Sequence, residues 1–281
     1  MTLSVVIITF NEEANLRRTL ESVQPLVSDG KGEIIVVDSG STDRTVEIAK
    51  SFGAKVFAQE WKGYAAQKNS AIGKATGDWI LSLDADEEVS DGMREFLLLI
   101  LFGSHREEFV NFRGGVLFGR RNYFLGRWIR HGGFYPDTKI RLFRPGTARF
   151  EDRLVHEDIQ LATGLQKYDP QLTYKMGDAI DIIHHSYPTV SDYIEHMNRY
   201  SSLGAEMVVA KASGKIRFSV INIVLRPLAT FLYNYFLRLG FLDGREGLLL
   251  HLYHAVYVSW KYAKAWELSR KQHDNLTDRS F

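Results

Sequence analysis

The sequence of 281 residues contains no cysteine. This absence excludes a disulfide framework, a zinc site with cysteine ligands and an enzyme with a cysteine nucleophile. Hydrophobic residues make up 45% of the chain and charged residues 25%. That composition is typical of a globular protein, and it excludes a disordered chain or a collagen-like repeat. The lack of cysteine also favours an intracellular protein.

The sequence also lacks an apolar run long enough to span a bilayer, which needs about 20 residues. Residues 218–237 are interrupted by Arg226, and residues 247–260 form a short run that contains two histidines. The N-terminus has no basic segment before its first apolar run, so it does not resemble a signal peptide. We therefore expect no transmembrane helix.

The net charge is negative over most of the chain and positive near its C-terminus. Residues 211–281 contain 11 Lys and Arg against 5 Asp and Glu, whereas residues 1–210 contain 24 against 29. An amphipathic, cationic segment rich in aromatic residues is typical of helices that lie on a membrane surface. Buried helices that complete the core are the alternative. The basic residues are sparse and no base-stacking motif accompanies them, so we expect no nucleic-acid partner.

The first 90 residues alternate between patterns typical of strands and of helices. Apolar, β-branched runs predict strands over residues 3–9, 33–37, 55–58 and 78–83. Helical patterns lie between them, and Asn11 is expected to cap the first helix. The alternation predicts an α/β fold, with a Rossmann-like, mostly parallel, doubly wound sheet.

The pattern is less regular after residue 90. It predicts strands over residues 109–118 and 139–143, and a long helix over residues 191–212 with Ser191 as its N-cap. Residues 213–281 are expected to form a helical C-terminal extension.

Polar and acidic residues follow three of the predicted strands, in segments 9–12, 38–43 and 84–88. The carboxyl ends of parallel strands meet at one edge of a sheet, where ligands of such folds bind. No glycine lies between Met1 and Asp29, which excludes the glycine-rich fingerprint of dinucleotide-binding proteins, and no P-loop is present. A diphosphate at this edge would therefore need another source of positive charge.

Asp84 and Asp86 lie two residues apart at the end of the fourth strand, so their carboxylates project from the same face. Two carboxylates held this close repel each other unless a cation lies between them. Oxygen ligands suit Mg²⁺ or Mn²⁺, which also bind phosphate oxygens and stabilise a leaving nucleoside diphosphate. The sequence therefore predicts a divalent-cation site, with a helix N-terminus as the alternative interpretation.

Three linked segments, residues 5–13, 35–43 and 81–87, resemble glycosyltransferase family 2 in their order and spacing. The resemblance implies the GT-A fold, an α/β domain that binds nucleotide sugars. It also implies inverting transfer of a sugar from a nucleoside-diphosphate sugar, assisted by a divalent cation.

Further segments resemble the branch of that family that contains the lipopolysaccharide core β-glucosyltransferases: residues 126–128, 132–137, 141–144, 155–157 and 241–244. This similarity implies transfer of glucose from UDP-glucose to a heptose of the lipopolysaccharide core or a similar lipid-linked saccharide. It implies a cytoplasmic enzyme, peripheral on the inner face of the cytoplasmic membrane and attached through its basic C-terminal region.

The resemblance also divides the chain. Residues 1–212 would form the GT-A domain, with a donor-nucleotide half over residues 1–90 and an acceptor half over residues 91–212. Residues 213–281 would form a basic, amphipathic helical extension.

The resemblance assigns the donor site to residues near the strand ends. Asp38 would bind the uracil ring, with Thr9 and Glu12 around the uridine. Lys68 matches a basic residue near the nucleotide, although a lysine on a helix surface is usually only solvated. Asp84 would lie near the ribose and the metal.

Asp86 would bind the metal directly. The roles of Arg141, Arg144, His184 and His185 are less definite. Arg141 and Arg144 could contact the diphosphate or acceptor phosphates, since arginine suits bidentate phosphate contacts. His184 and His185 could complete the metal site or pack in the core.

Inverting transfer needs a base that takes the proton of the acceptor hydroxyl, usually a carboxylate. The family often places this base in a Glu-Asp pair well after the paired aspartates. Here the matching residues are Glu157 and Asp158, of which Glu157 fits the Val-His-Glu form of the branch; Glu151 and Asp152 form a similar pair nearby.

Other functions remain open at this point. A polyprenyl-phosphate sugar transferase of the same fold would use a lipid phosphate as nucleophile and need no carboxylate base. A nucleotide-sugar-binding protein without transferase activity is a second alternative. A nucleotidyltransferase would need a glycine-rich basic loop after the first strand, which this sequence lacks.

Overall fold

The computed structural model describes residues 1–151, 158–170, 179–212 and 216–277. Contacts divide the chain into two compact units. The first comprises residues Met1–Arg121 and Pro136–His185, and the second comprises residues Asn122–Tyr135 and Ser186–Phe281.

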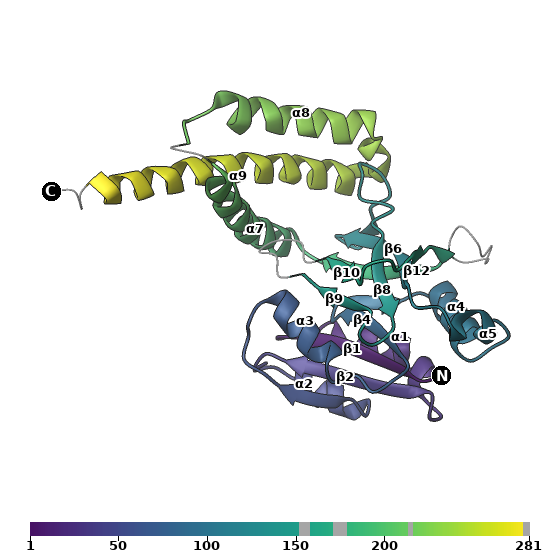
Figure 1. Ribbon diagram of the computed structural model, residues 1–281. Helices are drawn as coiled ribbons and strands as arrows, with labels where there is room; N and C mark the ends of the chain where they lie inside the picture. Colours follow the sequence, from purple (N-terminus) through teal and green to yellow (C-terminus); the bar gives the residue numbers. More distant parts are fainter. Residues whose placement is uncertain (152–157, 171–178, 213–215, 278–281) are drawn as a thin grey trace. The chain divides into compact units, whose positions relative to one another are not determined.

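Four parallel strands form one half of the sheet in the first unit (Figure 1), in the order β3-β2-β1-β4. Their bounds are β1 Leu3–Thr9, β2 Gly32–Asp38, β3 Lys55–Ala58 and β4 Trp79–Asp84. All neighbouring pairs among them are parallel. The predicted α/β fold with its doubly wound parallel sheet is therefore confirmed.

Helices cover both faces of this parallel half: α1 Leu16–Val27, α2 Thr45–Ser51, α3 Tyr64–Ile72 and α4 Asp91–Leu101. Alternate residues of β1 point to opposite faces. Val5 and Ile7 pack in the cluster that contains the apolar residues of α1 and α4, whereas Val6 packs in the cluster that contains Ala65 and Ala71 of α3. Burial on both faces explains why β1, β2 and β4 read as continuous apolar runs, whereas the edge strand β3 is mostly exposed.

Antiparallel pairing extends the sheet beyond β4, in the order β8-β6-β12-β5. These strands are β5 Glu87–Val89, β6 Gly115–Phe124, β8 Lys139–Phe143 and β12 Asp181–Tyr187. Strand β8 pairs with both β4 and β6, and β12 pairs with β5. The strand expected over residues 109–118 is partly wrong, because Phe109 lies in the short helix α5 Arg106–Val110 and packs in the core.

Four shorter strands complete the described strands. β9 Ala148–Phe150 and β10 Ile159–Leu161 form an antiparallel hairpin, while β7 Arg127–Trp128 and β11 Lys167–Tyr168 each pair with β6.

The second unit is mainly helical, as the predicted C-terminal extension required. Its helical segments are α7 Val190–Lys211, η1 Ile221–Leu225, α8 Arg226–Leu232, η2 Tyr233–Leu237, η3 Gly240–Asp243 and α9 Gly244–Thr277. Helix α7 packs against α9 and therefore belongs to the second unit. The sequence instead predicts a first domain that extends to residue 212. The expected N-cap Ser191 is wrong, since Thr189 caps α7 in a reciprocal pair with Asp192. None of the described helices combines the length and apolar character needed to cross a membrane.

Gly32 provides a test of the pairing between β1 and β2. A Cβ atom at Gly32 would lie 2.0 Å from the backbone oxygen of Leu3, whereas one at Gly73 would meet nothing closer than 3.5 Å. Backbone overlap cannot be relieved by a change of rotamer. Gly32→Ala should therefore lower the free energy of unfolding by about 2 kcal/mol or more, and Gly73→Ala by far less. Urea unfolding of both variants measures the difference, and equal effects would contradict the register.

Candidate active site

The candidate site lies where β1, β2 and β4 end side by side. The register pairs Thr9 of β1 with Asp38 of β2, and Ile8 of β1 with Asp84 of β4. The residues that follow each strand therefore meet at one edge of the sheet, as the strand order required.

Asp38 is buried and holds the loop that follows β2. Its carboxylate accepts hydrogen bonds from the Thr9 hydroxyl at 3.0 Å and from the backbone N–H groups of Gly40 and Ser41, each at 2.9 Å. The Ser41 hydroxyl donates a further bond. These four bonds fix the loop between β2 and α2 and place Thr9 directly against Asp38.

Asn11 connects the loops after β1 and β2. Its side-chain oxygen accepts a hydrogen bond from the Thr42 backbone N–H at 2.8 Å, and the Glu12 N–H donates to the Thr45 hydroxyl at 2.7 Å. Asn11 has a left-handed φ of 54°. The expectation that it caps α1 is wrong, because α1 begins at Leu16, one turn further along the chain.

Glu12 lies in a region of negative potential. Burial raises the pKa of its carboxyl to about 7, against the hydrogen bond from Asn15, and the negative charges of Asp86, Asp43 and Asp84 add to the increase. Glu12 thus shares the strand edge with both acids of the Asp-Ala-Asp sequence. Such a cluster of acids attracts a cation.

Asp84 is held by two basic side chains. Its Oδ1 lies 2.7 Å from Lys68 Nζ of α3, and its Oδ2 lies 2.9 Å from Arg141 Nη2 of β8. Burial alone would raise the pKa of Asp84, but the charges of Lys68 and Arg141 hold it well below its ordinary value. The sequence singled out all three residues, and the structure brings them together.

Glu87 of β5 is fully buried and shares Arg141 with Asp84. Its Oε1 lies 2.5 Å from Arg141 Nη2 and 3.3 Å from Arg120 Nη1, and its Oε2 accepts a bond from the Asp84 backbone N–H at 3.0 Å. Arg120 of β6 also binds Asp137, at 2.6 Å. The result is a chain of alternating charges, in the order Lys68, Asp84, Arg141, Glu87, Arg120, Asp137.

Sequence reasoning missed Glu87, Arg120 and Asp137 as parts of the site. Glu87 follows directly after the Asp-Ala-Asp sequence, and an arginine within an apolar strand such as β8 needs a buried carboxylate nearby. The presence of Arg141 in an apolar strand therefore indicates that a carboxylate must lie near it. The partner itself could not be identified, because 54 residues separate Arg141 from Glu87.

Asp86 faces β12. Its Oδ2 lies 3.2 Å from His184 Nε2. Burial raises the pKa of Asp86, but the interaction with His184 outweighs it and the pKa falls below its ordinary value. His185, the next residue along β12, pairs instead with Glu88, at 3.1 Å.

A metal at this edge would find two adjacent donors in Asp86 and His184. Asp84 differs, since each of its oxygens already binds a basic side chain. Within the described residues, no group of three or more His, Asp and Glu side chains is arranged to hold a metal ion. Of the two predicted ligands, Asp86 thus has fewer basic side chains competing with a cation.

The hairpin β9–β10 carries the predicted base region and is attached to α3. Asn69 of α3 exchanges two hydrogen bonds of 2.9 Å with the backbone of Phe150, and Lys68 Nζ lies 5.1 Å from the Phe150 ring. The next residue, Glu151, donates its N–H to the Asp158 carbonyl at 3.1 Å. Asp158 is exposed near this attachment, whereas Glu157 lies outside the residues that the structure describes.

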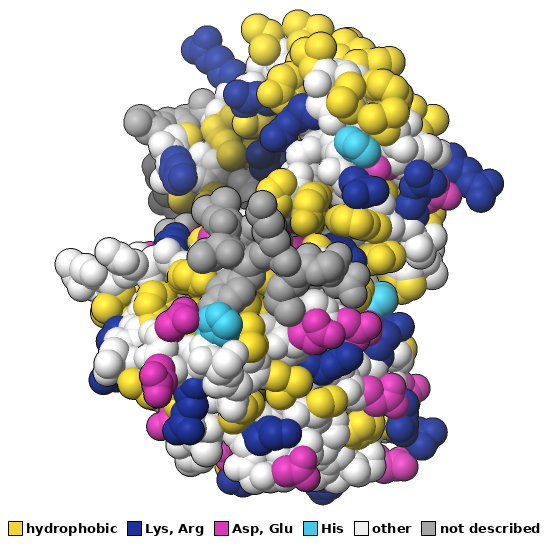
Figure 2. All heavy atoms as spheres, turned by 90° about the vertical axis from the view of Figure 1, so that its right-hand side faces the viewer, with side chains coloured by type: hydrophobic (Ala, Val, Ile, Leu, Met, Phe, Trp, Pro, Cys, Tyr) yellow, Lys and Arg dark blue, Asp and Glu magenta, His cyan; other side chains and the backbone are white. Residues whose placement is uncertain are grey.

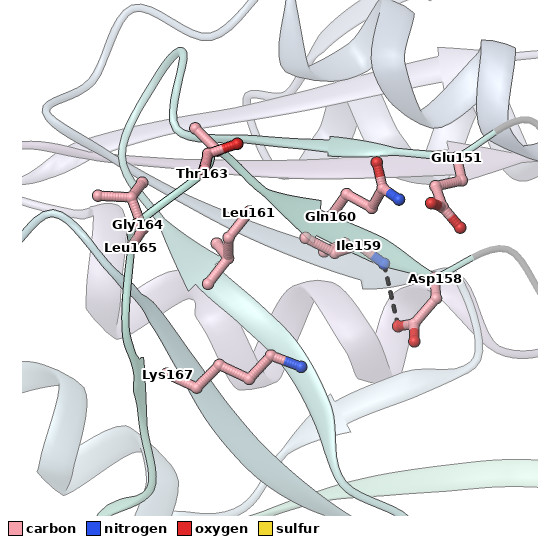
Figure 3. A pocket seen from close by; sticks show the side chains of 10 residues that line it. Glu151, Asp158, Ile159, Gln160, Leu161, Thr163, Gly164, Leu165 and Lys167 are labelled. Atoms are coloured by element: carbon pink, nitrogen blue, oxygen red, sulfur yellow. Dashed lines mark hydrogen bonds between the residues drawn. The ribbon is translucent and has the colours of Figure 1, made fainter.

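A cavity of about 380 Å³ opens beside this hairpin (Figure 3), with Glu151, Asp158 and Lys167 on its wall. The Asp158 carboxylate accepts a hydrogen bond from the Ile159 N–H at 3.0 Å. Gln160 and Thr163 add uncharged polar groups to the wall. Carboxylates, an amine and hydroxyl or amide groups around an open cavity suit a polar ligand with many hydroxyls.

Arg144 does not belong to the site. It is buried, its guanidinium lies 4.5 Å from the Trp79 ring, and it donates to the carbonyl oxygens of Phe109, Val110 and Phe112. The expectation that Arg144 contacts a phosphate is therefore wrong. Its function is to hold the segment after α5 against β4.

The fold and the site define the class of protein. A doubly wound sheet with an Asp-Ala-Asp sequence at the end of a central strand, continued by an antiparallel half, is a GT-A-type glycosyltransferase fold. The chain belongs to glycosyltransferase family 2, since the family model for glycosyl transferase family 2 matches residues 4–147. The resemblance drawn from the sequence motifs is confirmed, and the protein is an enzyme of this family.

Two similar proteins extend over almost the whole chain. An uncharacterized glycosyltransferase of Rickettsia typhi is 30% identical over 99% of this chain and 91% of its own. The lipopolysaccharide core biosynthesis glycosyltransferase LpsC of Rhizobium meliloti is 30% identical over 94% of this chain and 92% of its own. Among solved structures, residues 1–349 of Staphylococcus aureus TarS in complex with UDP align with a TM-score of 0.47 at 16% identity, covering 97% of this chain and 92% of that chain.

Replacing Glu87 tests the buried charge chain. Glu87→Gln leaves the buried Arg141 and the partly buried Arg120 with one carboxylate partner each, and should lower the free energy of unfolding by about 3 kcal/mol. Glu88→Gln is the matched control, because Glu88 is partly exposed and pairs with His185; it should cost less than about 1 kcal/mol. Chemical denaturation measures both, and equal losses would show that Glu87 has no special structural role.

Glu12 should make stability depend on pH. Its pKa rises from an ordinary 4.5 to about 7, so the folded protein retains a proton that the unfolded chain releases in this range. The Glu12 contribution to stability is thus present below pH 4.5 and is lost as the pH rises to about 7. Glu12→Gln should remove this part of the pH dependence in urea unfolding without added divalent cation. An unchanged slope would contradict the burial of the carboxyl.

Proposed function

We propose that the protein is an inverting glycosyltransferase that moves glucose from UDP-glucose onto a heptose of the lipopolysaccharide core or a similar lipid-linked saccharide. The observation that carries the proposal is the position of Asp84 and Asp86 at the end of β4, beside the loops after β1 and β2. The similarity to a lipopolysaccharide core biosynthesis glycosyltransferase over nearly the full length supports the acceptor class.

The donor nucleotide would occupy the carboxyl edge of the parallel strands. Thr9, Glu12 and Asp38 would surround the uridine, with Asp38 binding the uracil ring and keeping its loop in place. Lys68 and Arg141 would supply positive charge near the diphosphate, which no glycine-rich loop provides here. Both side chains are already oriented by Asp84, so little ordering is needed when the nucleotide binds.

The acids at this edge fit a divalent cation. Burial raises the pKa of Glu12, the nearby charges of Asp86 and Asp84 add to the increase, and a cation would neutralise this cluster. Asp86 would hold the Mg²⁺ or Mn²⁺ ion with His184 beside it, and Asp84 would lie near the ribose and the ion. When bound, such an ion supplies charge stabilisation for the departing UDP.

The acceptor hydroxyl must lose its proton as it attacks the anomeric carbon from the face opposite the diphosphate. Glu157 or Asp158 would accept that proton. The hairpin that leads to these residues is attached to α3 beside Lys68, which supports a base region near the donor site. The polar cavity next to Asp158 would receive part of the acceptor saccharide.

The proposal places the enzyme in the cytoplasm, on the inner face of the cytoplasmic membrane. A lipid-linked acceptor would meet a soluble nucleotide sugar there. Separate donor and acceptor halves within residues 1–212 remain part of this proposal.

The direct test is transfer of labelled glucose from UDP-glucose to a lipopolysaccharide core acceptor that ends in heptose. Asp86→Asn should reduce kcat/KM by roughly 10²–10³. Product analysis should show inversion at the anomeric carbon. Transfer from a GDP-sugar only, or to no saccharide acceptor, would contradict the proposal.

The base is identified by comparing three carboxamide variants in the same assay. Glu157→Gln or Asp158→Asn should reduce kcat by roughly 10²–10⁴ with little change in KM for the donor, whichever of the two is the base. Glu108→Gln is the control and should remain active, because Glu108 is exposed on α5 outside the site. Full activity in all three variants, with a polyprenyl phosphate as acceptor, would instead identify a polyprenyl-phosphate sugar transferase.

A further inference from the structure

The second unit has a continuous exposed apolar face on its helical segment 216–242. We call it the apolar ridge and define it by Ile221, Leu225, Leu228, Leu232, Phe236 and Leu239. Each of these side chains is between 45% and 65% exposed. The spacing of three or four residues from Ile221 to Phe236 places the first five along one side of the segment formed by η1, α8 and η2, and Leu239 follows η2. Figure 2 shows hydrophobic side chains gathered over α8 at the top of the view.

The opposite side of the same segment is fixed to α9. The Ile216 N–H donates to the Ser269 hydroxyl at 2.9 Å, and the Ser259 hydroxyl donates to the Ile223 carbonyl at 2.7 Å. Arg226 hydrogen-bonds the Tyr262 hydroxyl and lies 5.1 Å from its ring. These contacts hold the ridge outward, so a small rotation of the segment cannot bury it against α9.

The charge around the ridge has one sign. Residues 207–242 contain no Asp or Glu and five Lys and Arg. Arg217, Arg226 and Arg238 are exposed. Arg217 precedes the ridge, Arg226 follows Leu225 and contacts Tyr262 of α9, and Arg238 lies near the end of the ridge. The excess of positive charge over residues 211–281 adds to this field.

An exposed apolar face bordered by cations fits an anionic lipid surface. The apolar side chains can enter the boundary between headgroups and acyl chains, while the guanidinium groups remain at the phosphates. Tyr233 and Phe241 are exposed beside the ridge, and aromatic side chains favour this interfacial depth. A second copy of the chain fits less well, because pairing two ridges would bring the arginines of both copies together.

We propose that the apolar ridge docks the protein in the plane of an anionic bilayer, with segment 221–237 lying along the membrane surface. The biological role of this docking, which is to bring the enzyme to a lipid-linked acceptor, rests on the proposed function. The docking itself depends on the ridge and its arginines, so it can be measured without donor or acceptor.

The test uses the full chain and sedimentation with vesicles of phosphatidylcholine, with and without phosphatidylglycerol. The wild-type protein should bind the mixed vesicles, and added salt should weaken the binding. The double variant Leu228→Glu, Leu232→Glu should bind at least about tenfold more weakly. Val110→Glu is the matched control, because Val110 is 43% exposed on α5 and should leave binding unchanged.

A second variant separates the apolar from the electrostatic contribution. Arg217→Gln should weaken binding to the mixed vesicles severalfold and leave binding to pure phosphatidylcholine unchanged. Circular dichroism and the thermal midpoint should match the wild type in every variant, since the replaced side chains are exposed.

Three outcomes would overturn the proposal. The first is no binding of the wild-type protein to either vesicle, and the second is equal vesicle binding by the wild type and the folded Leu228→Glu, Leu232→Glu variant. The third is a wild-type dimer in sedimentation velocity that does not bind vesicles and that this double variant dissociates. A protein that binds vesicles but transfers no sugar would contradict the proposed function alone. A protein that transfers sugar to a soluble acceptor but ignores vesicles would contradict the ridge alone.

Discussion

The buried Arg141 holds the two halves of the sheet together at the site. It lies on β8, in the antiparallel half, and binds Asp84 at the end of β4 and Glu87 on β5. Burial of a guanidinium is costly unless carboxylates surround it, so the ends of these strands must meet around this side chain. Lys68 and Arg120 extend the same alternation of charge to α3 and β6. The site therefore has its cations in place before any ligand binds.

This arrangement gives the edge two electrostatic regions. Around Asp84 the acid is matched by the two cations Lys68 and Arg141. Around Asp86 the acids are less completely matched, and their negative charge adds to the increase that burial causes in the pKa of Glu12. A metal–diphosphate pair needs both regions, one positive and one negative. In the second unit the proposed membrane docking depends instead on the apolar side chains of the ridge, with arginines adding attraction to anionic lipids.

Much of the first unit could be predicted from the sequence, because β1, β2 and β4 are buried on both faces and read as local apolar runs. Asp84, Lys68 and Arg141 were found as well, since motif position marks them. Glu87 was not, because its importance depends on Arg141 and Arg120, which are distant in the chain and adjacent only after folding. Asn11 was misinterpreted for the same reason: its partner Thr42 belongs to the next loop rather than to the following helix.

The central claim is that the carboxyl edge of the parallel strands binds a uridine nucleotide together with a divalent cation. Thermal unfolding of the wild-type protein with UDP, GDP or ADP, each with and without Mn²⁺, tests it most directly. At about 100 times the dissociation constant, UDP with Mn²⁺ should stabilise the folded state by about 2.7 kcal/mol, and the shift should be smaller without the metal. A shift with GDP or ADP alone, or no shift with any nucleotide, would contradict the account.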